Sequence, residues 1–328
     1  MKRYDVTALG ELLIDFTENG KSPQGNPLFE ANPGGAPCNV LAMLAKLGHR
    51  TAFVGKVGND FFGEQLKSGI EEVGIDSSFL CMDDQIHTTL AFVHTVKDGD
   101  RDFSFYRNPG ADMMLTKEDV PEKVIQDSTV FHFGTLSMTH DGVREATKEA
   151  VCIAEKAGTL ISFDPNLRPP LWKSLDDAKE AVLYGLAHCQ ILKISDNEIQ
   201  WLTGEEDYSK GVEWINERYH IPLVLVSMGK QGSRAYYNNM MVEAAPFLQK
   251  DTIETTGAGD TFCGCVLHYI CEHGICNLTK DNLREMLVYA HAAASLITTR
   301  KGALRVMPDS KEVEEMLAHY GCIAANDK

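Results

Sequence analysis

The sequence predicts an α/β protein with a mainly parallel central sheet, helices on both of its faces and a small antiparallel insert. Short apolar runs alternate along the chain with longer amphipathic stretches, a pattern typical of repeated strand and helix units. One interval, residues 88–107, departs from this pattern and alternates at the period of a strand. A chain of 328 residues with 44% hydrophobic residues can bury a large core. We therefore expect three layers, with the insert beside them.

The elements of the body follow one another in a regular order. Strands are expected at residues 6–9, 52–57, 130–133, 160–164, 191–194 and 223–227. Helices are expected at residues 38–47, 142–157, 178–186 and 210–218. Because helical stretches separate the strands, neighbouring strands are predicted to be parallel.

The insert is predicted from two alternating runs, TTLAFVHTV and RDFSFYR, on either side of a turn at residues 97–100. Together with the Gly- and Pro-bearing stretch at 19–33, it predicts a lid formed by about 12–34 and 86–113. The lid is inserted in a single domain of residues 1–328. One lid face is expected to cover a ligand and the other to meet a second subunit in a homodimer, because both faces carry apolar side chains such as Leu90, Phe92, Phe103 and Phe105.

Composition excludes several partners. The chain has 31 basic and 47 acidic residues, a formal net charge of −16, which argues against nucleic acid or an anionic membrane as partner. Nine cysteines without paired CxxC spacing predict reduced thiols, and the absence of a leader or of a long apolar run predicts a cytoplasmic protein. Four histidines lack metal-ligand spacing and are interpreted as core or surface residues: His87, His94, His132 and His140.

The segment TTGAGDTF, residues 255–262, is the most informative motif. Gly257, Ala258 and Gly259 lack bulky side chains, so their N–H groups can hold an anion at the start of a helix. The carboxylate of Asp260 beside a phosphate suits a base for a hydroxyl nucleophile. From these residues alone, an ordinary acidic residue in a first helical turn remains the alternative.

Polar residues also follow the predicted strands, where ligands of open α/β sheets bind. Asp15 follows the first strand, Gly34, Gly35 and Asn39 open the first helix, and Arg168 ends the run DPNLR after another strand. Side chains of this kind suit the hydroxyls of a polyol, and exposed backbone donors suit the phosphates of a nucleotide. The sequence therefore predicts a site that brings a polyol and a nucleotide together.

The chain resembles the ribokinase-like (PfkB) carbohydrate kinases, and among them the fructokinases. Two signatures carry the resemblance, GGAPCNVLAMLAKLG at 34–48 and ETTGAGDTFCG at 254–264. Four further segments match in the expected order: GELLIDF (10–16), FSFYRNPGADMML (103–115), DPNLRPPLW (164–172) and TTRKGAL (298–304). The resemblance implies a ribokinase-like α/β/α fold and ATP-dependent transfer of a phosphoryl group to the 6-hydroxyl of D-fructose.

The resemblance also implies a role for individual residues. Asp260 would be the base, and the N–H groups of Gly257, Ala258 and Gly259 would surround the transferring phosphoryl group. Residues implied to face the sugar are Asp15, Gly34, Gly35, Asn39, Arg168 and, arriving from the lid, Arg107. Residues implied to line the ATP site are Lys193, Ser195, Ser227, Gly229, Gly232 and His291.

Metal ions are implied at two places. Mg²⁺ would neutralise the ATP phosphates and reach Glu198 through water, although Ser195 stands where ribokinases have Asn. A monovalent cation such as K⁺ would lie in the loop formed by Glu254, Thr256, Ile297, Arg300 and Gly302. Glu254 replaces the usual Asp there and Val306 replaces a hydroxyl residue, so we expect weak stimulation by K⁺. Arg300 is open to two interpretations, a solvated turn or part of the nucleotide site.

Other functions remain open from the sequence. The same fold suits a kinase for another sugar or a sugar acid such as 2-keto-3-deoxygluconate, and a catalytically silent sugar-binding regulator. A nicotinamide-binding protein is disfavoured, because no GxGxxG follows the first strand.

Overall fold

Within residues 2–95 and 101–326, which the computed structural model describes, the largest sheet has ten strands. Nine of them are ordered β14-β13-β12-β11-β10-β9-β1-β4-β5, and β6 pairs with β4. Neighbours from β12 to β5 are parallel, whereas β13 and β14 form an antiparallel edge. The predicted mainly parallel sheet is confirmed. The strands are β1 (Tyr4–Leu9), β4 (Thr51–Gly58), β5 (Ile75–Asp76), β6 (Leu80–Asp83), β9 (Ser128–Gly134), β10 (Leu160–Asp164), β11 (Ile191–Ser195), β12 (Leu223–Ser227), β13 (Ser233–Tyr237) and β14 (Met240–Ala244).

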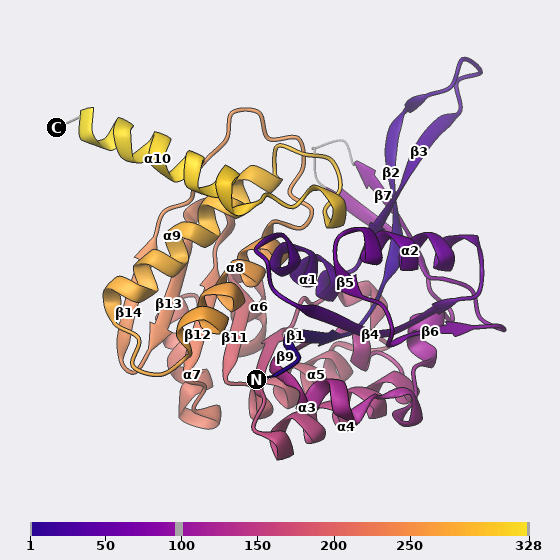
Figure 1. The fold of residues 1–328 in the computed structure, drawn as a ribbon, viewed down its shortest axis with the longest axis horizontal. Helices are drawn as coiled ribbons and strands as arrows, with labels where there is room; N and C mark the ends of the chain where they lie inside the picture. Colours follow the sequence, from indigo (N-terminus) through magenta and orange to yellow (C-terminus); the bar gives the residue numbers. More distant parts are fainter. Residues whose placement is uncertain (1, 96–100, 327–328) are drawn as a thin grey trace.

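Helices cover both faces of this sheet, as Figure 1 shows. One layer contains α1 (Ala36–Lys46), α2 (Phe61–Glu72), α8 (Ala258–His273), α9 (Lys280–Ile297) and α10 (Ser310–Asn326). The other contains α3 (Glu122–Gln126), α4 (Asp141–Ala157), α5 (Leu175–His188), α6 (Asp196–Thr203) and α7 (Tyr208–Tyr219). Short 3₁₀ turns lie at Ala111–Met114, Lys117–Asp119, Leu136–Met138, Pro169–Leu171, Gly229–Gln231 and Leu304–Val306.

Two hydrophobic cores result from the alternation of side chains along the strands. In β1, Val6 and Ala8 belong to the core beneath α1 and α8, whereas Leu9 belongs to the core beneath α4 and α5. In β4, Phe53 and Val54 divide in the same way. Because both faces of the sheet are buried, the strands are apolar on both faces, as parallel strands require.

The lid is a separate four-stranded sheet in the order β3-β2-β7-β8. Its strands are β2 (Leu13–Lys21), β3 (Pro27–Gly34), β7 (Leu90–Thr95) and β8 (Arg101–Tyr106). The antiparallel pairing of β7 with β8 confirms the predicted hairpin, although its predicted turn at 97–100 lies outside the described residues. Figure 1 shows β2 and β3 projecting from the body.

Asp15 follows the first strand along the chain and lies within the predicted lid range of about 12–34. It is part of β2, opposite Asn32 of β3 and Ala91 of β7. The lid itself therefore carries this carboxylate. No helix in the described part of the chain has the length and apolarity needed to cross a membrane.

Candidate active site

A cavity of about 920 Å³ lies between the lid and the carboxyl edge of the central sheet. Ser195 and Ser227, which end the neighbouring strands β11 and β12, contribute to its wall. This arrangement confirms that polar residues at strand ends meet at one edge. The predicted residues that line the cavity are Asp15, Gly35, Asn39, Arg168, Lys193, Ser195, Glu198, Ser227, Gly229, Gly232, Glu254, Thr256, Gly257, Ala258, Gly259, Asp260 and His291.

The turn before α8 requires glycine at its first position. Gly257 has φ of 76°, and a β-carbon added to it would lie 2.8 Å from Cβ of Ala303. The N–H of Thr261 donates to the carbonyl of Gly257 at 2.7 Å, so the N–H groups just before Thr261 precede the helical ladder. Among them, the N–H of Ala258 donates to the carbonyl of Thr255 at 3.2 Å, which holds the turn. A helix N-terminus suited to an anion thus lines the cavity.

Asp260 lies in the first turn of α8, where its carboxylate meets a side chain of α1. Nδ2 of Asn39 donates to Oδ2 of Asp260 at 2.8 Å, and Oδ1 of Asn39 is buried without a hydrogen-bond partner among the described residues. Burial raises the pKa of Asp260 although the Asn39 hydrogen bond lowers it, and nearby Asp164 raises it further. A carboxylate with a raised pKa accepts a proton more readily, which suits a general base.

A buried ion pair lies beside the turn that precedes Asp260. Nζ of Lys193 lies 2.9 Å from Oδ2 of Asp164, and both side chains are almost fully buried. Burial acts to lower the pKa of Lys193, but the attraction of Asp164 and Glu198 raises it. A β-carbon on Gly259 would lie 3.4 Å from Nζ of Lys193, an ordinary van der Waals distance, so the ammonium lies directly beside the turn. Lys193 therefore places a fixed positive charge beside the anion site.

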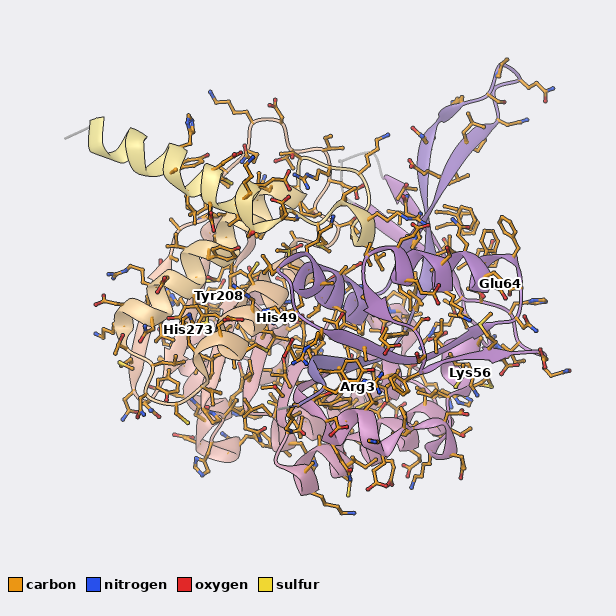
Figure 2. The ribbon with its side chains drawn as sticks, viewed as in Figure 1. Arg3, His49, Lys56, Glu64, Tyr208 and His273 are labelled. Carbon is orange, nitrogen blue, oxygen red and sulfur yellow. The ribbon has the colours of Figure 1, made fainter. Side chains whose placement is uncertain are left out.

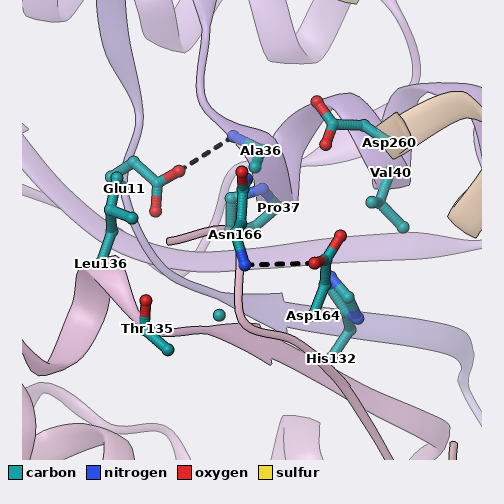
Figure 3. Close-up of a pocket in the computed structure, with 11 residues that line it drawn as sticks. Glu11, Ala36, Pro37, Val40, His132, Thr135, Leu136, Asp164, Asn166 and Asp260 are labelled. Atoms are coloured by element: carbon teal, nitrogen blue, oxygen red, sulfur yellow. Dashed lines mark hydrogen bonds between the residues drawn. The ribbon is translucent and has the colours of Figure 1, made fainter. Parts of the chain in front are cut away.

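A small chamber of about 10 Å³ lies against Asp260, and Figure 3 shows the side chains that surround it. The N–H of Asn166 donates to Oδ1 of Asp164 at 3.2 Å and thereby orients the loop after β10. His132 is buried with Nδ1 3.0 Å from Oγ of Ser162, and burial lowers its pKa to about 3. His132 is therefore a neutral core residue, in keeping with its prediction.

Glu11 is a site residue that the sequence reasoning missed. It lies in the chamber wall, and its Oε1 accepts the N–H of Ala36 at 2.9 Å at the start of α1 (Figure 3). Burial raises its pKa to about 7. The position directly after Gly10, at the end of a buried strand, was the signal that could have identified it.

The end of the cavity nearest the lid carries opposed charges. Burial raises the pKa of Asp15 to about 7, while Arg168 lowers it and Asp260 raises it. Gly34 leaves room for Asp15, because a β-carbon there would lie 2.2 Å from Oδ2 of the carboxylate. Gly35 has φ of 128° and its backbone lines the cavity.

Arg107 is placed differently from the expectation. Its guanidinium is buried and pairs with Asp112, with Nη2 2.6 Å from Oδ2. The same guanidinium donates to Oγ1 of Thr139 at 2.9 Å and to the carbonyl of Leu136 at 3.0 Å. These partners engage all three nitrogens of the guanidinium, so Arg107 anchors the end of the lid, and it is not among the residues that line the cavity.

The end of the cavity beside β12 and β13 is made largely of backbone and small residues. Gly229 and Gly232 have φ of 51° and 96°, and the N–H of Met228 donates to the carbonyl of Gly232 at 2.8 Å. His291 hydrogen-bonds Oγ of Ser233 through Nε2 at 2.8 Å, and burial lowers its pKa to about 4. A neutral imidazole thus lines this end.

Glu198 connects two strand ends. Its carboxylate accepts the N–H of Leu167 at 2.7 Å, and both the N–H and the hydroxyl of Ser195 at 2.8 Å. These bonds complete a capping box at the start of α6. A carboxylate has about four acceptor positions, so Glu198 retains capacity toward a hydrated cation in the cavity.

The loop expected to hold a monovalent cation is already internally bonded. Oε1 of Glu254 accepts the N–H of Gly302 at 2.8 Å, and the carbonyl of Ile297 accepts the N–H of Arg300 at 3.1 Å. The guanidinium of Arg300 donates to the carbonyl of Val306 at 2.8 Å and pairs with Glu312. Gly34, Ile297, Arg300 and Gly302 are not among the cavity-lining residues.

Comparisons of sequence and of structure with known proteins identify the same kind of relative. The sequence profile described as pfkB family carbohydrate kinase matches residues 4–310. A probable fructokinase-4 of Arabidopsis thaliana is 38% identical over 314 residues, which cover 95% of this chain and 96% of the relative. Fructokinase of Xylella fastidiosa with bound ATP has a TM-score of 0.88 and 29% identity, with 97% of this chain and 99% of that chain covered. Fructokinase of Vibrio cholerae O395 with bound fructose, ADP and calcium ion has a TM-score of 0.85 and 28% identity, with coverage of 96% and 99%.

Proposed function

The chain belongs to the pfkB family of carbohydrate kinases, and on that premise we propose that it transfers the γ-phosphoryl group of ATP to the 6-hydroxyl of D-fructose. The observation that carries the proposal is the position of Asp260. Its carboxylate is partly buried at a helix N-terminus in a cavity that has hydroxyl-binding side chains at one end and a glycine-rich wall at the other. These are the parts that phosphoryl transfer to an alcohol requires.

The chemistry follows from this geometry. Asp260 takes the proton of the sugar hydroxyl as its oxygen forms a bond to the γ-phosphorus. The bond from the γ-phosphorus to the bridging oxygen breaks, and ADP leaves with that oxygen. The N–H groups of Gly257 and Gly259 and the charge of Lys193 stabilise the negative charge of the transferring group, while the N–H of Ala258 holds the turn. The products are fructose 6-phosphate and ADP.

We place the sugar at the end of the cavity nearest the lid, and this end favours a neutral sugar over a sugar acid. The carboxylate of Asp15 lines the cavity and is an acceptor for hydroxyl protons. Arg168 is the cation facing it, and the charge of Arg168 is offset by Asp15 and Asp260. A carboxylate substrate would add another negative charge to this end. The charge balance therefore favours fructose over 2-keto-3-deoxygluconate.

ATP would lie along Ser227, Gly229 and Gly232, with His291 toward the base. Mg²⁺ bound to its phosphates would neutralise their charge, and the residue suited to hold its water shell is Glu198. The residues of the cation loop, with Glu254 bonded to Gly302, fit K⁺ only as a weak ligand set. We propose K⁺ as a stimulator, not as a requirement.

We also propose a homodimer formed through the lid. Leu13, Asp15 and Phe105 line the cavity from one lid face. The opposite face carries Phe16 stacked on Phe92, with ring centroids 4.7 Å apart. Tyr106, 65% exposed, lies beside Phe92 and extends this apolar surface. A second lid could cover it. Light scattering should give twice the chain mass, and a monomer at micromolar concentration would contradict the dimer.

The experiment that tests the function is a coupled assay of ADP release. The full-length protein, with ATP and Mg²⁺, is given D-fructose, D-ribose and 2-keto-3-deoxygluconate in parallel. We expect fructose to have the highest kcat/KM. A higher kcat/KM for another acceptor would replace fructose as the substrate. No release with any of them, together with sugar binding in calorimetry, would identify a silent sugar-binding regulator.

A further inference from the structure

A cluster of imidazole and carboxylate side chains lies far along α8 from the cavity. Nε2 of His49 is 2.7 Å from Nδ1 of His268 and 4.0 Å from Oε1 of Glu272. One ligand atom of each residue lies within 4.8 Å of the others. Figure 2 labels His49 beside α8. None of the three is among the residues that line the cavity.

The fold fixes this arrangement. His268 and Glu272 are four residues apart on α8, so they lie on the same helix face. His49 follows Gly48, which has φ of 87°, in the turn that ends α1. The N–H of His49 donates to the carbonyl of Leu44 at 3.0 Å, a bond of the Schellman type, and this bond holds the backbone of His49 over α8.

We propose that His49, His268 and Glu272 form a binding site for one Zn²⁺ ion. Two imidazole nitrogens and one carboxylate are ligands that zinc uses with a water at the fourth position. With Zn–N bonds of about 2.0–2.1 Å, the two nitrogens would separate to about 3.3 Å around a tetrahedral ion. A small ring movement supplies this change, and Glu272, whose side chain is 57% exposed, can close onto the ion from solvent.

The surroundings suit a metal-binding histidine. Oδ2 of Asp5 lies 3.7 Å from Nδ1 of His49, the ring nitrogen on the side away from the cluster. This distance is longer than a hydrogen bond, but it places a carboxylate on the side of the ring where a metal-bound histidine usually directs its other N–H. Arg50 holds Asp5 in place through a bond of 2.9 Å and offsets part of the negative charge.

The site would connect two helices that also meet at the active site. α1 carries Asn39 and α8 carries Asp260 near their first turns, and these side chains are hydrogen-bonded. His268 lies eight residues after Asp260, which is about 12 Å along the helix axis. Zn²⁺ would therefore crosslink α1 to α8 at the opposite end from the catalytic groups. We expect it to raise the melting temperature without contacting substrate.

The test uses the full-length chain, stripped of metal, kept reduced and free of nucleotide. Calorimetric titration with ZnCl₂ should show one ion per chain. Glu272→Gln should weaken binding by at least about tenfold, because it removes an anionic ligand at an exposed position. His268→Gln should abolish binding, and His273→Gln, a change at an exposed histidine of the same helix labelled in Figure 2, should leave binding unchanged. Zn²⁺ should raise the melting temperature of the parent and of His273→Gln alone.

The absorption spectrum of bound Co²⁺ distinguishes binding at this site from binding at cysteine thiolates. Co²⁺ in the proposed site should give visible bands without thiolate charge transfer in the near-ultraviolet. A thiolate band, an absence of Zn²⁺ binding by the parent, or affinity unchanged by Glu272→Gln would each overturn the proposal. Glu272→Gln decides the matter even if His268→Gln does not fold.

Discussion

The two ends of the cavity are built in different ways. At the sugar end, Asp15, Asn39 and Asp260 present buried or partly buried polar side chains, and burial raises the pKa of both carboxylates. At the nucleotide end, Gly229 and Gly232 contribute backbone in conformations that favour glycine. Hydroxyl groups are distinguished by oriented side chains, whereas phosphates are held by N–H groups that any close backbone can supply. The comparison predicts that charge-removing substitutions have their largest effects at the sugar end.

The largest effect is expected for the base. Asp260→Asn keeps the acceptor for Asn39 and removes the proton acceptor, so kcat should fall by about 10² to 10⁴ with little change in sugar KM. Steady-state assays measure both constants. Asp281→Asn, in the first turn of α9, is a matched control that should retain parental kcat. A kcat for Asp260→Asn within a few-fold of the parental value would contradict the assignment of Asp260 as the base.

The next effect concerns sugar binding. Asp15→Ala deletes a charged hydrogen-bond acceptor, worth about 1.5–3 kcal/mol, so the fructose KM should rise by about 10- to 100-fold. The ATP KM should remain near the parental value, because Asp15 is placed at the other end of the cavity. Glu18→Ala, an exposed change on the same strand, serves as the control. Equal loss of affinity for both substrates would show that the two ends are not separable.

A smaller effect is expected in stability. Glu11 has its pKa raised from 4.5 to about 7, so its folded form prefers the proton. Ionisation of Glu11 therefore removes stability as the pH rises from about 4.5 to about 7. Glu11→Gln stays neutral. As the pH rises from about 4.5 to about 7, its free energy of unfolding should therefore increase by up to about 3 kcal/mol relative to that of the parent. Urea unfolding at both pH values measures the difference, and Glu18→Gln should show none. A difference independent of pH would mean that Glu11 ionises normally.

The smallest effect is expected at the cation loop. Because Glu254 is bonded to Gly302 and Val306 supplies no hydroxyl, exchanging Na⁺ for K⁺ at fixed Mg²⁺ should change kcat by less than about tenfold, below ~1.4 kcal/mol. Initial rates in the two salts at equal ionic strength measure this. Near-complete dependence on K⁺ would show that backbone carbonyls and Glu254 suffice.

The sequence predicted most of the body because its signals are local. The apolar strand runs at 160–164 and 223–227 coincide with β10 and β12, and the turn before Asp260 combines small residues with a helical run. The edge strands β13 and β14 were not predicted. β13 pairs with β12 and with β14, and this pairing depends on tertiary contacts that local sequence patterns do not show.

The site was less predictable where long-range contacts decide the orientation of a side chain. Arg107 matches a lid motif, but its partners Thr139 and Leu136 lie about thirty positions later, so the motif could not show that they satisfy its donors. Glu11 was missed for the related reason that its partner is the N–H of Ala36. Its role at the start of α1 depends on the packing of β1 beside that helix.

The central claim is that Asp260 activates the 6-hydroxyl of fructose in this cavity. The most direct measurement is ³¹P and ¹³C NMR of the product formed from D-fructose and ATP by the parent and by Asp260→Asn. We predict fructose 6-phosphate from the parent and almost none from the variant in the same time. Phosphate on the 1-hydroxyl, or equal yields of fructose 6-phosphate from both proteins, would contradict the account.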